Sequence, residues 1–169
     1  MNTLDVEEQK DALSTPPQLA AWLHDQGLLP GGEVSRGEHE RWLALREALR
    51  RLLLANNEGQ PDPADLALLD RLAVESRLTP RFEAGTVSLE PAVAGAAGAL
   101  GRLLAVVADA MREGPWSRLK ACSEHTCQWA FYDRSKNHSG HWCSMRVCGN
   151  RAKARQFRER RRSGSKAGP

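Results

Sequence analysis

The sequence lacks the features that mark several large classes of protein. Its least polar stretch, Pro91 to Met111, is broken by Arg102 and Asp109, whereas a membrane-spanning helix needs about 20 strongly apolar residues. Met1 to Asp11 has no basic start followed by an apolar run, so no signal peptide is expected. Four cysteines in 169 residues are too few for a disulfide scaffold. These absences predict a soluble, cytoplasmic chain with reduced thiols.

Signatures of catalysis are also missing. No glycine-rich phosphate loop, Ser/His/Asp set or pair of carboxylates stands out, and these are the usual marks of phosphate binding and acid–base chemistry. His24 and His39 are isolated on predicted helices, where surface or capping roles are expected. We therefore expect no enzyme. A small-molecule reaction in the N-terminal part of the chain is the alternative with the least support.

The charge, in contrast, is present but unevenly distributed. Residues 1–115 contain 11 Lys+Arg and 18 Asp+Glu, a net charge of −7, whereas residues 116–169 contain 13 and 3, a net charge of +10. The small total of +3 hides this difference. Such asymmetry indicates a basic module attached to an acidic domain. We divide the chain into an acidic domain at 1–115, a basic module at 116–162 and a flexible tail at 163–169.

Hydrophobic periodicity predicts a mainly helical acidic domain. Trp42, Leu45, Leu49 and Leu52 follow helical spacing and form a candidate core stripe. Thr15, Ser35 and Asp62-Pro63 are typical helix starts, while the alternation at 81–90 predicts a β-hairpin. The fold class is therefore mainly α (α+β). The expected helices are 17–28, 37–55, 63 to a stop at Pro80, and 92–112, the last with Gly and Ala residues that permit close packing.

All four cysteines lie in the basic module, with the spacing C-x4-C-x15-C-x4-C. Two equal pairs separated by such a loop are typical of zinc sites, and four thiolates close the coordination shell of a structural ion. The predicted ligands of one structural zinc ion are Cys122, Cys127, Cys143 and Cys148. Three alternatives remain open: two disulfides, an iron–sulfur cluster, or replacement of one cysteine by His125, His138 or His141.

The residues around the cysteines predict a small treble-clef-like finger. Trp129 to Tyr132 is expected to form a strand, and Trp129, Phe131 and Trp142 can shelter the thiolates. A helix is expected from Ser144 to about Arg162, with the last two cysteines in its opening turns. At about 100° per residue, one face of this helix is expected to pack on the finger. The residues of that face are Val147, Asn150, Ala154 and Phe157.

Beside this face, basic side chains form two stripes on the same helix. One stripe contains Arg151, Arg155, Arg158 and Arg162, and the other contains Arg146, Lys153 and Arg160. Glu159 is the one acidic residue of the helix that could compensate their charge. Guanidinium groups pair with phosphates and with guanine edges, so we expect the module to bind DNA. The candidate contact residues are Arg134, Lys136, Arg146, Arg151, Lys153, Arg155, Arg158, Arg160 and Arg162. RNA is an alternative, because exposed aromatic residues of the finger, such as Tyr132, could stack on unpaired bases. An acidic protein partner is another.

The segment Trp142-Cys143-Ser144-Met145, followed by Val147 to Arg155, carries a motif that can be assigned to a known family. With Cys148-Gly149-Asn150-Arg151 at its centre, it closely resembles the CGNR zinc-finger family over Leu119 to Arg162. The first 115 residues are more loosely similar to the ABATE domain, the usual partner of this finger in bacterial stress-induced transcription regulators.

The resemblance implies a bacterial regulator whose finger binds DNA and whose helical domain senses a small-molecule effector or another signal. It also implies that the four cysteines bind zinc. Family members usually begin with an apolar strand that ends near an Asn-Thr pair, whereas here Asn2-Thr3 follow Met1 directly. A homodimer is compatible with symmetric DNA sites, although no heptad pattern marks an interface.

Overall fold

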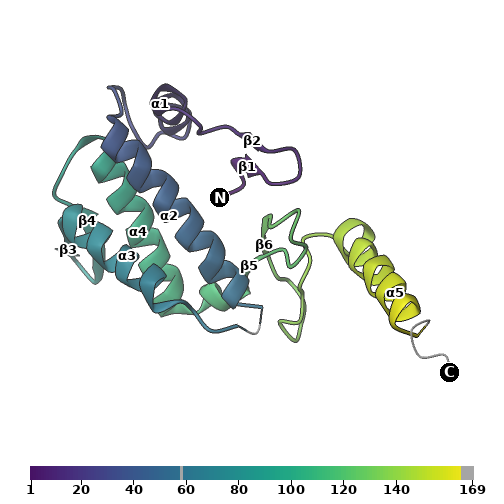
Figure 1. Ribbon diagram of the computed structural model, residues 1–169. Coiled ribbons are helices and arrows are strands. Elements are labelled where there is room, and N and C mark those ends of the chain that lie inside the picture. The colour runs from purple at the N-terminus through teal and green to yellow at the C-terminus, as the bar shows by residue number, and fades with distance from the viewer. Residues whose placement is uncertain (58, 165–169) are drawn as a thin grey trace.

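A computed structural model describes residues 1–57 and 59–164 of the chain (Figure 1). A helical body, a small finger and a projecting C-terminal helix follow one another along the sequence. The elements are β1 (Leu4–Asp5), β2 (Lys10–Asp11), α1 (Pro16–Asp25), α2 (Arg36–Ala55), α3 (Pro63–Glu75), β3 (Leu78–Glu83), β4 (Thr86–Pro91), α4 (Gly95–Glu113), a 3-10 turn (Pro115–Arg118), β5 (Leu119–Ala121), β6 (Ala130–Tyr132), a π-helical turn (Met145–Gly149) and α5 (Asn150–Gly164). This arrangement confirms the mainly α (α+β) fold class. The end of the predicted flexible tail, 165–169, lies outside the described residues.

The three predicted helix caps are present, whereas the fourth helix begins at Gly95 and not at residue 92. Thr15 and Ser35 each accept a bond from the backbone three residues later, and Gln18 and Glu38 return a side-chain bond to the cap backbone. These reciprocal capping boxes satisfy amide groups that have no partner within the helix. Asp62 caps α3, with proline in the first turn. Local chemistry therefore determines where α1, α2 and α3 begin.

The predicted core stripe of α2 is buried, with Trp42, Leu45, Leu49 and Leu52 all at most 5% exposed. The indole Nε1 of Trp42 donates to the carbonyl of Ala96 at 3.1 Å, which fixes α2 against the start of α4. Figure 1 shows α2, α3 and α4 packed side by side, so the body has a single helical core.

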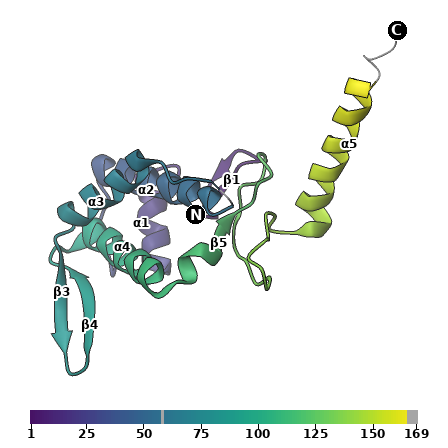
Figure 2. The ribbon, with the colours of Figure 1, turned by 90° about the horizontal axis from the view of Figure 1, so that it is seen from below.

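The β3–β4 hairpin is longer than predicted. It pairs Leu78 with Pro91, so α3 ends at Glu75 and the expected helix stop at Pro80 is wrong. The physical reason is Arg77, whose φ of +50° takes the chain out of the helix before Pro80, and Pro80 becomes a strand residue. Figure 2 shows the hairpin projecting from the body.

The finger is fixed to the end of α2 by hydrogen bonds. The Asn56 Nδ2 donates to the carbonyls of Trp116 and Leu119, both at 2.8 Å, and the Asn57 Nδ2 donates to Ala121 at 2.6 Å. The buried Arg50 guanidinium also reaches the carbonyl of Gln128 at 3.1 Å. These contacts hold β5 and the finger on the helical body.

The N-terminal residues complete the attachment. Asn2 donates from Nδ2 to the carbonyl of Ala130 at 3.0 Å and accepts from its amide at 2.7 Å, as an additional strand would. The side chain of Arg46 pairs with Asp11 at 2.7 Å and ties the β1–β2 ribbon to α2.

None of the helices within 1–57 and 59–164 combines the length and the apolar composition that a membrane span requires.

The close packing expected of α4 can be tested at Gly101. A Cβ at this position would meet the side chains of Ser76 and Pro91 at 2.8 Å. We expect Gly101→Ala to lower the free energy of unfolding by about 1–3 kcal/mol, because overpacking forces neighbours apart. The matched control is Gly37→Ala on α2, where the added methyl has ordinary contacts and is expected to be neutral or stabilising. Denaturant unfolding of both variants measures this, and equal effects would contradict it.

Candidate metal centre

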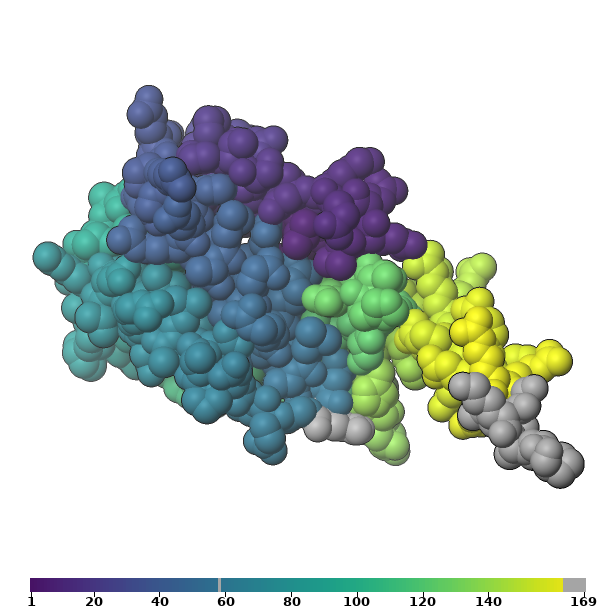
Figure 3. Space-filling view, in the orientation of Figure 1, coloured from purple at the N-terminus to yellow at the C-terminus, as the bar shows by residue number. Residues whose placement is uncertain are grey.

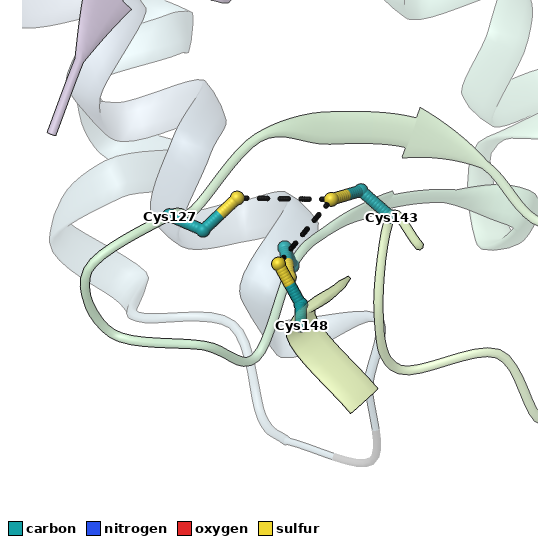
Figure 4. Close-up of side chains that lie close together, drawn as sticks. Cys127, Cys143 and Cys148 are labelled. Atoms are coloured by element: carbon teal, nitrogen blue, oxygen red, sulfur yellow. Dashed lines mark hydrogen bonds between the residues drawn. The ribbon is translucent and has the colours of Figure 1, made fainter. Parts of the chain in front are cut away.

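The four cysteine sulfurs converge at one point of the finger. All four lie within 4.8 Å of one another. The Sγ atoms of Cys127 and Cys143 are 3.7 Å apart, and those of Cys143 and Cys148 are 3.8 Å apart (Figure 4). A tetrahedral zinc ion with Zn–S bonds of about 2.3 Å requires sulfur–sulfur edges of about 3.8 Å. The observed spacing therefore matches a single tetrahedral ion, and it is far from the disulfide bond length of about 2.05 Å.

Without a cation, the surroundings of these cysteines disfavour their thiolate form. Burial, with contributions from the neighbouring thiols, raises the pKa of Cys143 to about 12 and raises the pKa of Cys148 as well. A bound divalent cation reverses this effect, because it stabilises coordinating thiolates directly. The donor set thus fits one structural zinc ion, held by four cysteines and with no open position for chemistry.

Two local backbone structures present the sulfurs. Cys122 follows β5, and its amide donates to the carbonyl of Trp129 at 2.9 Å, while the Cys127 amide donates to Glu124 at 2.8 Å. Cys148 lies in the π-helical turn, whereas Cys143 precedes it, so only one of the two ligands expected in the opening turns lies there. The amide of Gly149 donates to the carbonyl of Ser144, five residues earlier, at 3.1 Å, which is the hydrogen-bond spacing of a π-helix.

The three histidines of the array lie outside the sulfur cluster, which contains cysteines alone among the described residues. The imidazole of His125 contacts the Glu124 carboxylate at 2.9 Å. His141 packs edge-on against Trp142 at 5.8 Å between ring centroids. Of the aromatic residues expected to shelter the thiolates, Phe131 and Trp142 are half-buried and Trp129 is 43% exposed.

A buried ion pair anchors the loop that follows β6. Lys120 and Asp133 are 3.1 Å apart, and both side chains are 3% exposed. Burial alone would raise the pKa of Asp133, but bonds from the Ser135 and Gly140 amides and from Lys120 hold this pKa well below its usual range. The candidate contact residues Arg134 and Lys136 are exposed on this anchored loop.

The orientation of α5 differs from the prediction. Cys148 is 3% exposed and must face the sulfur cluster, so residues about 180° around the helix face outward. Phe157, nine residues later, is 62% exposed, and Val147 is 48% exposed. The expected packing of the face with Val147, Asn150, Ala154 and Phe157 on the finger is wrong. The need to aim Cys148 at the other sulfurs outweighs burial of a weak apolar stripe.

The side of α5 that faces the protein contains two predicted DNA contacts. Arg155 donates to both carboxylate oxygens of Glu124 at 2.9 Å, and Arg151 donates to both oxygens of Glu7 at 3.0 and 2.8 Å. The space-filling view shows the N-terminal segment and α5 meeting at this end of the molecule (Figure 3). Arg158 and Arg162 are exposed farther along the same side, whereas Arg146, Lys153 and Arg160 are exposed nearer the outward face.

Two family profiles match the chain. The profile described as "putative stress-induced transcription regulator", ABATE, matches residues 1–113, and the profile of the CGNR zinc finger matches residues 118–161. The chain belongs to the ABATE family. No curated protein matches the sequence. In this ABATE protein the two matches coincide with the helical body and with the finger and its helix, in agreement with the family resemblance inferred from the CGNR motif.

Sequence reasoning missed the acidic partners of α5. Glu124 is 1% exposed and comes from the basic module, while Glu7 comes from the ribbon of the ABATE domain. One signal was available for Glu124, because it is one of only three acids in residues 116–169. A rare acid within a basic segment is a candidate for a structural ion pair. No comparable signal marks Glu7, which is 144 positions from Arg151.

Metal content tests the centre directly. We expect one zinc ion per chain by elemental analysis, and we expect a chelator to unfold the finger while α1 to α4 persist, because the free energy of metal binding stabilises the fold of a small zinc module. Hydrogen exchange resolves the two regions. A protein without metal, or one with iron and visible absorption, would overturn this assignment.

The Glu124–Arg155 pair is expected to hold α5 in place. Glu124→Gln removes the charge at this contact, so amide exchange in 150–162 should accelerate several-fold while zinc content stays constant. Glu113→Gln is the control. Glu113 is exposed and pairs with Arg112 at a distance of 3.3 Å, and this pair lies outside the finger. Equal exchange rates in both variants would show that the pair does not restrain the helix.

Proposed function

We propose that this ABATE protein is a non-catalytic transcription regulator that acts in the cytoplasm and binds duplex DNA through α5. The observation that carries the proposal is the placement of α5, which extends away from the body with its free end in solvent (Figure 2). A helix attached only near its start can lie in the major groove, which admits an α-helix.

The charge distribution supports this role. Residues 116–169, which contain α5, have a net charge of +10, and residues 1–115 have a net charge of −7. Phosphate contacts by Lys and Arg provide most of the sequence-independent affinity for DNA. The acidic body is repelled by the same phosphates, so the protein approaches DNA with the finger first.

The zinc ion has an indirect role in this proposal. When bound, it supplies a cation that stabilises the four thiolates. The chain's own residues do the rest: Cys148 fixes the rotation of α5 about its axis, and Glu124 and Glu7 hold it through Arg155 and Arg151. Binding therefore requires an intact finger, although the metal touches no DNA.

The helical domain at 1–115 is proposed as the sensing or dimerisation module. A cavity of about 550 Å³ lies between the start of α2, the end of α3 and the start of α4, and Trp42, Leu72 and Leu100 are among its lining residues. This volume is within the range of small-molecule sites. The other end of α2 holds the finger through Asn56 and Asn57, so one helix joins the cavity to the DNA-binding module.

RNA remains a second candidate, because Trp129 and Tyr132 are 43% and 47% exposed on the finger and could stack on bases. An acidic protein partner would use the charge of α5 alone. Measuring affinities for duplex DNA and single-stranded RNA at one salt concentration separates the nucleic acids. Steep salt dependence does not separate them, since both predict it.

Removal of two outward cations tests DNA binding. Arg146→Ala/Lys153→Ala should weaken duplex binding for all sequences and reduce the slope of log affinity against log salt by about 2, since each phosphate contact contributes about one unit. The control Arg36→Ala/Arg71→Ala removes two exposed cations from the acidic domain and should leave the slope unchanged. Fluorescence anisotropy over a salt series measures both. Equal slopes in the two variants would contradict a phosphate-binding role for α5.

A further inference from the structure

The exposed face of α5 has a composition that folding does not explain. Phe157 is 62% exposed, with the guanidinium carbon of Arg161 5.8 Å from its ring centroid. An exposed aromatic ring gains little from folding, because burial is what stabilises apolar surface. Its surface is available for contact with a partner.

The rotation of α5 defines which residues accompany Phe157. Cys148 faces the sulfur cluster and Arg155 faces Glu124, so the opposite face is centred near Phe157. Asn150 and Ala154 lie within about 60° of Phe157 on this face, and both are exposed. The Asn150 Nδ2 donates to the Arg146 carbonyl at 3.0 Å, so one of its two amide hydrogens is used within the helix and the other is left for a partner. Lys153 flanks the row.

These residue types match the base edges of one kind of pair. Asn pairs with the N6/N7 edge of adenine in the major groove, and Ala or Phe contacts the 5-methyl group of thymine. Arg146 and Lys153 lie together on one flank of this row, where they are suited to the phosphates along one side of the groove. Asn150 and Phe157 are seven residues apart, or about 10.5 Å along the helix, which spans about three base-pair steps of 3.4 Å.

We infer that the outward face of α5 reads A·T pairs in the major groove, with Asn150 on adenine and with Ala154 and Phe157 on thymine methyl groups within about three base pairs. The inference rests on the proposed function and names the sequence class that the same helix selects. Arg151 and Arg155, on the opposite side, are positioning residues that hold this face toward the groove.

The test uses the zinc-loaded full chain and a library of random duplexes. The wild type should enrich a motif with A·T pairs. Replacing thymine by deoxyuracil in that motif removes one methyl group and should weaken wild-type binding about fourfold, yet it should barely change binding by Phe157→Ala. Asn150→Ala should relax the preference at one adenine by about tenfold or more. Lys153→Ala is the matched control, and it should weaken all sequences equally.

The outcomes separate this inference from the proposed function. If the wild type binds no duplex, the proposed function fails. If the wild type binds duplexes but deoxyuracil affects wild type and Phe157→Ala equally, or the motif contains only G·C pairs, the base-reading inference is overturned while DNA binding stands. If Phe157→Ala changes the molar mass in sedimentation and leaves sequence preference intact, the ring is a contact between copies instead. Zinc content and circular dichroism confirm that each variant is folded.

Discussion

The position of one sulfur atom determines much of what this protein presents to its surroundings. Because Cys148 must point at the other three cysteines, the rotation of α5 about its own axis is set by the π-helical turn that precedes it. Every side chain farther along the helix then has an assigned direction. Arg155 is directed at Glu124, and Phe157 is directed at solvent. The metal centre is structural in the usual sense, and it also sets the direction of a surface.

A second constraint is the attachment of the finger to the ABATE domain. Asn56 and Asn57, at the end of α2, donate to three backbone carbonyls of the segment that leads into the finger. The opposite end of α2 lines the cavity. A helix is a stiff element, so a shift at the cavity can reach the finger without passing through flexible loops. For the proposed regulator, this is a physical basis for coupling between the cavity and α5.

Local chemistry made much of this protein predictable. Capping residues located the starts of α1, α2 and α3, and the spacing of the cysteines predicted the zinc site, because both depend on residues close together in sequence. The rotation of α5 was not predictable from its apolar residues, since Val147 and Phe157 suggested an inward face that the sulfur cluster overrides. The Glu7–Arg151 pair joins residues 144 positions apart, and no periodicity records such a contact. The stop of α3 depended on the backbone of Arg77, which the residue type does not reveal.

The projection of a basic helix from an acidic body also has a kinetic consequence. Opposite charges concentrated at the two ends of one molecule give it a large electric dipole, and the field around DNA applies a torque to that dipole before contact. In the proposed association with DNA, this torque would rotate the protein during its approach, so that a larger fraction of encounters begins with α5 toward the duplex. Electrostatic steering of this kind raises association rates and falls with ionic strength. In the proposed DNA-binding role, the arrangement would therefore affect the rate of association as well as the affinity.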